Sequence, residues 1–357
     1  MAATRCAGML PSEADKERIR RHRAFWSRSP VGRPLIGTTI GTFPSVRAIC
    51  GNGALTPADL DLERNLSELE EEWYQWRDAM GDAIWSAFPL WAFPWHLAIA
   101  GSPIERRDSN LWGLPVPDLH AGSAHPSLSS GNPWFRLLVD FTLALRQRAA
   151  GRYPLGIGPL MFSPPDIVMQ LLGQDRLALE LYDAPEWVTA LGQAVVELCA
   201  EVTEALFDLI PTYGGGYCGT SRYLWAPGKL VETGEDVSFM LSPRLHRRLV
   251  VPMHRYLARR FPFTVVHLHS RQLHTVPNLL EVQEIAAFQI TPDFGEDMLQ
   301  HLPVMARILE HKPLVVHGVM SITTMKEIIR SLDHRGLALL CRCESPDDAR
   351  AVLDALL

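Results

Sequence analysis

The sequence predicts a single (β/α)8 barrel that carries an N-terminal helical extension. Eight short segments rich in β-branched and apolar residues alternate with helix-length amphipathic stretches, and strands that alternate with helices form parallel sheets. The length of 357 residues suits a barrel built as one unit. With 47% hydrophobic and 21% charged residues, the chain can bury a large core.

The chain opens with a helix pattern. Ser12 is an N-cap candidate, and mixed charges with periodic apolar positions predict a helix over 12–26. We place this helix in an extension over 1–33, ahead of the barrel over 34–357.

The strands and helices of the barrel follow in turn. The first strand is short, β-branched and closed by Gly41 and Pro44. We expect the eight strands near 35–43, 82–88, 155–158, 215–219, 263–269, 286–291, 314–318 and 337–341. The expected helices lie over 60–80, 133–150, 185–209, 243–261, 296–311, 321–333 and 346–357.

Charge and composition exclude several classes of function. The net charge of -6 provides no basic surface for nucleic acid or anionic lipid. Six cysteines are too few for a disulfide scaffold in so long a chain, so a reducing cytoplasm is the expected compartment. Prolines interrupt the apolar stretch 83–101, which therefore predicts a strand and an aromatic loop rather than a membrane span.

Functional side chains are expected at the carboxyl ends of the strands, because the loops there share one mouth. We assign catalytic roles to Asp236, Asp293 and His317. The predicted substrate-binding residues are Trp95, Tyr217, Arg222 and Trp225. The predicted metal ligands are His267, His269, Cys341 and Cys343.

A zinc site is the most specific of these expectations. Residues two apart on a strand point to the same face, so VVHLHS aims the imidazoles of His267 and His269 into one cavity. A thiolate from Cys341 or Cys343 would supply a soft third ligand and leave a fourth position open. The alternative is that both histidines are ordinary hydrogen-bonded residues and both cysteines are small buried hydrophobes.

The other candidates also have two interpretations. Asp293 or His317 would fill the fourth metal position or support the ligands. Arg222 would hold a substrate carboxylate, or form a surface salt bridge. Trp95 would contribute to an apolar wall, or to the core. Asp236, just before a helix start, would act in catalysis, or in capping or salt bridging.

Four stretches of the chain resemble the uroporphyrinogen decarboxylase superfamily, which has a barrel fold. The longest is YLWAPGKLVETGEDVSFMLSPRLHRRLVVPMHRYL, with an acidic residue before a Ser-Pro helix start. It is followed by VVHLHS, where methyltransferase members carry His-x-Cys. FPWHLAIAGSPI is similar to the Pro-Trp segment of the superfamily, and GLALLCRCESPDDARAVLDAL to its closing strand and helix.

The resemblance implies one of two activities. Uroporphyrinogen decarboxylases need no cofactor, whereas zinc-dependent methyltransferases pass a methyl group between a corrinoid and a thiol. The chain departs from the decarboxylases because 33–43 lacks their arginine-rich segment. It departs from the methyltransferases because His269 replaces the expected Cys after His267, while Cys341 or Cys343 lies near the expected position of the last ligand.

Our leading hypothesis is a zinc-dependent transferase that moves a methyl or other alkyl group to a metal-activated thiol or similar nucleophile. The alternative is a metal-independent decarboxylase or lyase on a small carboxylated substrate, anchored by Arg222. A third hypothesis is a non-catalytic barrel that binds a corrinoid or a partner subunit. No region is left over for a corrinoid domain, so a corrinoid donor would come on a separate protein. The other expected partner is a small-molecule substrate, and a homodimer is a possible assembly.

Overall fold

A six-stranded parallel sheet forms the centre of the molecule, with strand order β1-β12-β11-β10-β9-β8. The structure is a computed structural model that describes residues 8–41, 49–90, 92–108, 110–160, 162–219 and 221–357. The strands of this sheet are β1 (Leu35–Ile40), β8 (Leu230–Thr233), β9 (Phe263–His269), β10 (Ala287–Thr291), β11 (Leu314–Gly318) and β12 (Leu337–Cys343).

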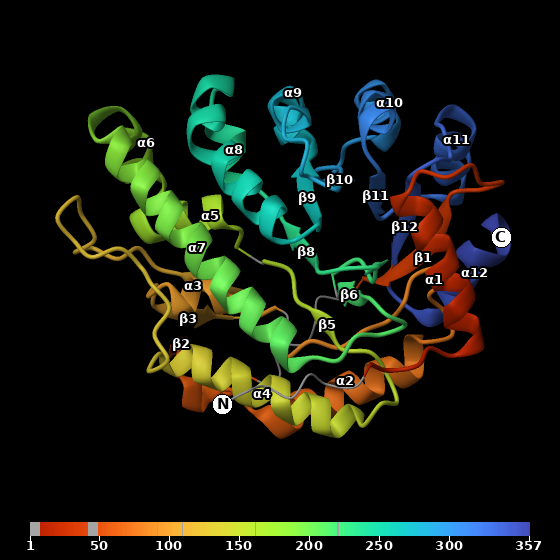
Figure 1. Ribbon diagram of the computed structural model, residues 1–357, viewed down its shortest axis with the longest axis horizontal. Helices are drawn as coiled ribbons and strands as arrows, with labels where there is room; N and C mark the ends of the chain where they lie inside the picture. The colour runs from red at the N-terminus through yellow and green to blue at the C-terminus, as the bar shows by residue number, and fades with distance from the viewer. Residues whose placement is uncertain (1–7, 42–48, 91, 109, 161, 220) are drawn as a thin grey trace.

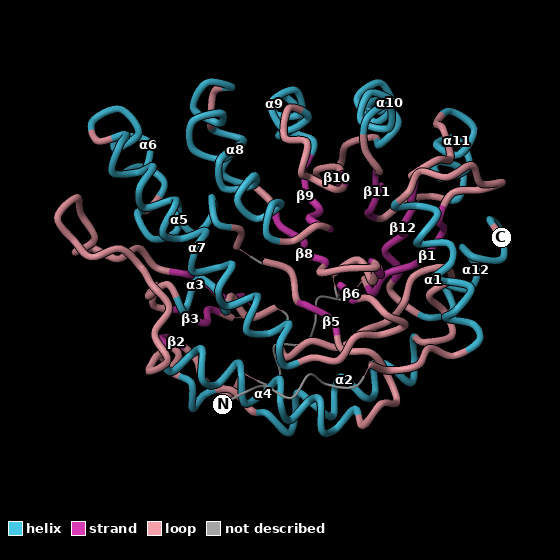
Figure 2. The backbone as a smooth tube through the Cα atoms, in the orientation of Figure 1, coloured by secondary structure: helices cyan, strands magenta, loops and turns pink. Residues whose placement is uncertain are grey.

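Helices cover the outer side of this sheet (Figures 1 and 2). They follow the strands in sequence, as expected for parallel strands that need a crossover connection. These helices are α8 (Pro243–Arg260), α9 (Val276–Leu280), α10 (Leu302–His311), α11 (Ile322–Ser331) and α12 (Pro346–Leu356). Short 3-10 helices interrupt three of the connections: η3 (Asp236–Met240), η4 (Ser270–Thr275) and η5 (Met298–His301).

The rest of the chain supplies the other helices and two small sheets. Its helices are α1 (Glu13–Trp26), α2 (Leu62–Trp76), α3 (Trp95–Ile99), α4 (Pro133–Ala149), α5 (Pro164–Leu172), α6 (Gln174–Asp183) and α7 (Pro185–Leu209), with η2 at Pro57–Asp59. Two small sheets are formed by β2 (Gly53–Ala54), β3 (Ile104–Arg107) and β4 (Asn110–Gly113), and by β5 (Gly156–Ile157), β6 (Tyr217–Gly219) and β7 (Trp225–Ala226).

The described residues do not form one continuous eight-stranded sheet, as the predicted barrel would. The expected strand over 82–88 is irregular, although the backbone of Asp82 bonds to Ile36 and that of Ala87 to Pro154. The strand β8, which the sequence patterns did not predict, takes a place in the main sheet instead. The fold is therefore α/β with a parallel six-stranded sheet, consistent with a barrel of this type.

Local sequence explains where two of the long helices begin. The side chain of Ser12 accepts a hydrogen bond from the backbone of Asp15 at the start of α1. Ser242 caps α8 in the same way, and Pro243 takes the first helical position, where a missing N–H costs nothing. Within the described part of the chain, no helix is long and apolar enough to cross a membrane.

Candidate metal centre

A cavity of about 350 Å³ lies at the carboxyl ends of the main strands. Parallel strands present these ends at one edge, and register places Thr39 beside Arg342 and Gln289 beside His267. Side chains from β1, β8, β9, β10, β11 and β12, and from the turns that follow β5, β6 and β8, line the cavity. The sequence therefore gathers polar groups from distant segments into one site.

Three predicted site residues meet at one wall of this cavity. One ligand atom each of Asp236, His267 and His269 lies within 4.8 Å of the others, which makes this group able to hold a metal ion. The two imidazole rings pack edge to face with centroids 4.7 Å apart. The spacing of two residues on β9 thus places both histidines on the same face, as the sequence predicts.

His267 is oriented by Gln289. Its Nδ1 atom and Nη2 of Arg222 both contact Oε1 of Gln289, the latter at 2.8 Å. Nη2 of Arg222 also lies 3.1 Å from Nδ1 of His267, so Nδ1 is occupied by protein contacts and Nε2 is the ring nitrogen left for a ligand. Burial, together with the charge of Arg222, lowers the pKa of His267 well below its ordinary value, so the ring is neutral near pH 7.

The second imidazole, His269, is less engaged by the protein. Its buried Nδ1 makes no hydrogen bond among the described residues and lies 3.5 Å from Oδ1 of Asp293. Asp293 accepts hydrogen bonds from Ser270 and the backbone of Arg271. Burial raises the pKa of Asp293, but these hydrogen bonds outweigh it and the pKa falls below the ordinary value. Asp293 is therefore an anion next to Nδ1 of His269.

His317 lies on a different wall of the cavity. Its Nε2 contacts the hydroxyl of Thr39 at 2.9 Å, and its Nδ1 that of Thr291 at 3.4 Å. Burial, with the charges of Arg222 and Arg342, lowers the pKa of His317 well below the ordinary value. His317 is thus a neutral side chain in the cavity wall. It is not part of the three-residue metal group.

Arg222 lines the cavity but is largely committed to the protein. Its guanidinium donates to Gln289 and lies 3.4 Å from Glu232, and both side chains are mostly buried. Burial raises the pKa of Glu232 and lowers that of Arg222. These contacts favour an internal ion pair over the predicted anchor for a substrate carboxylate.

The two cysteines do not meet the imidazoles. Arg342 lines the cavity, and neighbours on a strand point to opposite faces, so Cys341 and Cys343 face the helical side. Both are buried, with the Cys341 thiol 3.5 Å from the carbonyl of Met320. The Cys343 thiol beside it lowers the pKa of Cys341 to about 7. In place of a thiolate, the structure brings Asp236 to the histidines.

Three predicted substrate-binding residues lie outside the cavity lining. Trp95 is buried in the core, and its indole donates to the carbonyl of Pro89. Trp225 is fully buried in a second apolar cluster, where its indole donates to Tyr213. Tyr217 packs edge to face on Phe207. These three aromatic side chains therefore pack against the rest of the protein, which for Trp95 was the alternative interpretation.

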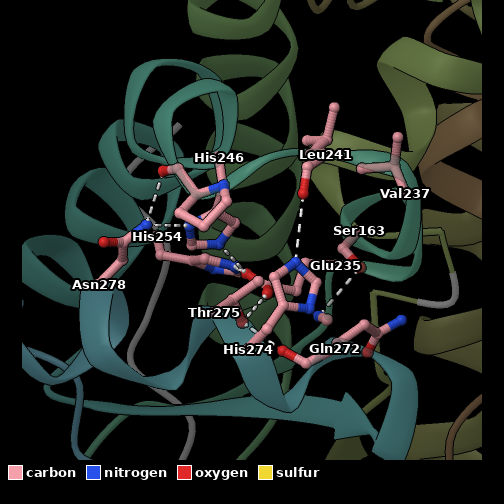
Figure 3. Close-up of polar contacts among 12 residues, drawn as sticks. Ser163, Glu235, Val237, Leu241, His246, His254, Gln272, His274, Thr275 and Asn278 are labelled. Atoms are coloured by element: carbon pink, nitrogen blue, oxygen red, sulfur yellow. Dashed lines mark hydrogen bonds and ion pairs between the residues drawn. The ribbon is translucent and has the colours of Figure 1, made fainter.

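Two acidic groups near the centre were not singled out as catalytic or binding residues. Asp166 is buried in the cavity wall, where burial and the neighbouring Asp236 raise its pKa to about 7. Glu235 is fully buried behind Asp236 and pairs with His246 and His254 (Figure 3). Neither role has a spacing signal in the sequence, because each depends on contacts between distant segments.

The residues of the three-residue group fit a divalent metal ion such as zinc. A carboxylate with two imidazoles is a common catalytic donor set that leaves one position open. The Nδ1 contact of His267 with Gln289 is the outer hydrogen bond that metal-bound histidines usually make. Nδ1 of His269 makes no hydrogen bond among the described residues, and the Asp293 carboxylate lies 3.5 Å from it.

Fold and site together define an α/β protein with a candidate metal centre at the carboxyl edge of a parallel sheet. The fold is similar to a methyltransferase from Methanosarcina mazei, with a TM-score of 0.63 over 94% of this chain and 96% of that chain. The two sequences are 12% identical, so this likeness shows the fold alone. A search of protein-family models finds no match.

Sequence comparison adds one further likeness. A stretch of 249 residues, 65% of this chain, is 26% identical to the serine/threonine-protein phosphatase with EF-hands 2 of Mus musculus. It spans 28% of the length of that protein. The identity is low and the match covers less than a third of that protein, so it does not show the family of this chain.

Proposed function

We propose that the chain is a zinc-dependent transferase that moves a methyl or other alkyl group to a thiol or a similar soft nucleophile. The observation that carries the proposal is the group of Asp236, His267 and His269 in the wall of the cavity. The likeness in fold to a methyltransferase supports this class of reaction.

The residues of the cavity have separate roles in this proposal. Asp236, His267 and His269 would hold the zinc, which supplies a positive centre that lowers the pKa of a nucleophile at the open position. Gln289 keeps the His267 ring turned so that Nε2 is available. In the transfer, the carbon forms a bond to sulfur as its bond to the donor breaks, and the thiol proton goes to solvent.

We further propose that a corrinoid on a separate protein is the donor. Three exposed apolar side chains, Phe239, Phe294 and Val319, lie in the loops after β8, β10 and β11. The same strand ends line the cavity, so these side chains would contact a partner that delivers a group to it. Phe294→Asp should weaken transfer from a protein-bound corrinoid and spare transfer from free methylcobalamin.

The test is a transfer assay with methylcobalamin as donor and 2-mercaptoethanol as acceptor, read by mass spectrometry of the methylated thiol. We expect turnover by the zinc-loaded protein and its loss in His269→Ala and Asp236→Ala. His301→Ala, at a half-buried histidine of η5 that pairs with Glu296 outside the cavity lining, is the matched control and should keep the wild-type rate. Equal rates in all four proteins would remove the proposed centre from the reaction.

The alternative is a metal-independent decarboxylase or lyase. It needs a cation for a substrate carboxylate, and Arg222 is already held by Glu232 and Gln289. Activity that survives complete removal of metal by a chelator would favour this alternative over the transferase.

We also propose that the main sheet belongs to a closed ring. The segment 82–88 is bonded to β1 on one side and, through Ala87, to the β5 segment on the other, and β5 pairs with β6 in parallel. These contacts support a ring in which 82–88 takes the place of the second strand. An experimental structure would test whether β6 also pairs with β8.

A further inference from the structure

The turn over 234–237 carries Asp236 and is built around a buried charge. Glu235, the residue before Asp236, is fully buried in the structure. Burying a carboxylate costs free energy unless hydrogen bonds compensate it. The partners of Glu235 therefore decide where this turn lies.

Three donors from other segments surround the Glu235 carboxylate (Figure 3). Nε2 of His246 and Nε2 of His254, both from α8, lie 3.0 and 2.9 Å from its Oε2. The hydroxyl of Thr275 donates to Oε1 at 2.7 Å. The carboxyl group is thus held by three hydrogen bonds.

The other flank of the turn is held by the start of α5. Gly234 donates its backbone N–H to the hydroxyl of Ser163 at 2.9 Å, and Val237 donates to Oδ1 of Asp166 at 2.7 Å. The backbone on both sides of Asp236 is therefore fixed by buried partners.

Gln272 joins this turn to the strand that carries the histidines. Its Oε1 accepts from the backbone N–H of His269 at 2.7 Å, and its Nε2 lies 3.2 Å from Oδ1 of Asp236. The Thr275 hydroxyl, which bonds to Glu235, also lies 2.8 Å from the backbone carbonyl of Gln272. One buried amide thus sets the distance between two of the three candidate ligands.

We propose that Glu235 and Gln272 are positioning residues of the metal centre, which fix Asp236 against His269 without touching the metal. This inference rests on the proposed function, because it assumes that Asp236, His267 and His269 hold the ion. It goes beyond that function because it assigns metal affinity and geometry to a hydrogen-bonded cluster outside the cavity lining. Mutation of residues that hydrogen-bond to metal ligands commonly weakens metal binding by about 10–100-fold.

Cobalt(II) is a suitable probe, because its visible spectrum reports ligand geometry as well as binding. We expect Gln272→Leu and Glu235→Ala to bind cobalt about 10–100-fold more weakly than the wild type, with an altered spectrum. Glu235→Gln should stay close to the wild type, because its amide oxygen accepts from both imidazoles and its amide nitrogen donates to Thr275. His96→Asn, at a buried histidine bonded to Thr203, is the control and should bind normally.

The outcomes separate this inference from the proposed function. Wild-type affinity and spectrum in Gln272→Leu would overturn the inference, and so would a Glu235→Gln variant as weak as Glu235→Ala. Gln272→Leu decides the question if Glu235→Ala does not fold, as judged by circular dichroism. If the wild type binds no cobalt, or Asp236→Ala binds it equally well, the proposed function fails and the inference falls with it.

Discussion

Two pairs of histidines lie on either side of the turn over 234–237, and they differ in what their ring nitrogens contact. His246 and His254 are fully buried, and their Nε2 atoms both bond to Glu235. His267 and His269 are partly exposed and line the cavity, so a ligand in the cavity can reach this pair. We call them the closed pair and the open pair.

The comparison shows that the position of the nearby carboxylate determines whether a pair of histidines stabilises the fold or can bind an ion. In the closed pair, an internal anion uses both Nε2 atoms, so the pair stabilises the fold. In the open pair, the nearby carboxylate of Asp236 shares a site with both rings, and an ion can bind between them. The closed pair then serves the open pair, because it fixes the turn that carries Asp236.

The largest expected effect comes from breaking the closed pair. Glu235→Ala leaves two buried imidazoles without their acceptor and should lower the free energy of unfolding by about 3–5 kcal/mol. Urea unfolding without metal measures it. His269→Ala, in the open pair, should cost less than about 1 kcal/mol. Similar losses in the two variants would contradict the contrast between the pairs.

A buried histidine outside both pairs, His96, provides a further comparison through the pH dependence of the free energy of unfolding. Burial lowers the pKa of His96 from its ordinary 6.5 to about 4. The unfolded chain therefore takes up this proton first as the pH falls, so folding loses free energy from pH 6.5 down to about 4. The loss amounts to about 3 kcal/mol. Urea unfolding of His96→Asn should not show this loss over the same pH range. If the wild type and His96→Asn lose the same free energy of unfolding, the loss does not come from His96.

The open pair should stabilise the protein only when metal is present. Zinc at 100 times its dissociation constant should raise the free energy of unfolding of the wild type by about 2.7 kcal/mol. Thermal or urea unfolding with and without zinc measures this increment. It should vanish in His267→Ala and persist in His96→Asn. An increment that survives in His267→Ala would place the metal elsewhere.

The smallest effects come from the amides that support each pair. Asn278 lies 3.1 Å from Nδ1 of His246, and Asn278→Ala should lower the free energy of unfolding by about 1 kcal/mol. Gln289→Leu, at the partner of His267, should act on zinc affinity instead. Isothermal titration together with urea unfolding separates the two effects. The reverse assignment, with zinc affinity changed by Asn278→Ala alone, would contradict the comparison.

Parts of the fold could be predicted from the sequence because buried parallel strands are continuous apolar runs. The expected strands over 263–269 and 314–318 agree with β9 and β11 at both ends. The segment over 82–88 is also mostly apolar but is irregular. Apolar character alone predicts that a segment is buried, but it does not predict that the segment pairs with a neighbouring strand. β8 has four residues, too few for a periodic signal.

The site was predictable only where spacing determines direction. A spacing of two residues correctly placed His267 and His269 on one face. The same spacing placed Cys341 and Cys343 on one face of β12, but no local pattern tells which face is inward. The closed pair was missed for another reason, because its acceptor Glu235 comes from a separate turn.

The central claim is a metal centre made of Asp236, His267 and His269, and its most direct test is the zinc content of untagged protein by elemental analysis. We expect about one zinc per chain, lost in alanine variants of these three residues. The zinc should be retained in Cys341→Ser and Cys343→Ser, which test the thiolate ligands predicted from the sequence. A folded wild type that holds no zinc after incubation with it, or loss of zinc only in the cysteine variants, would contradict the account.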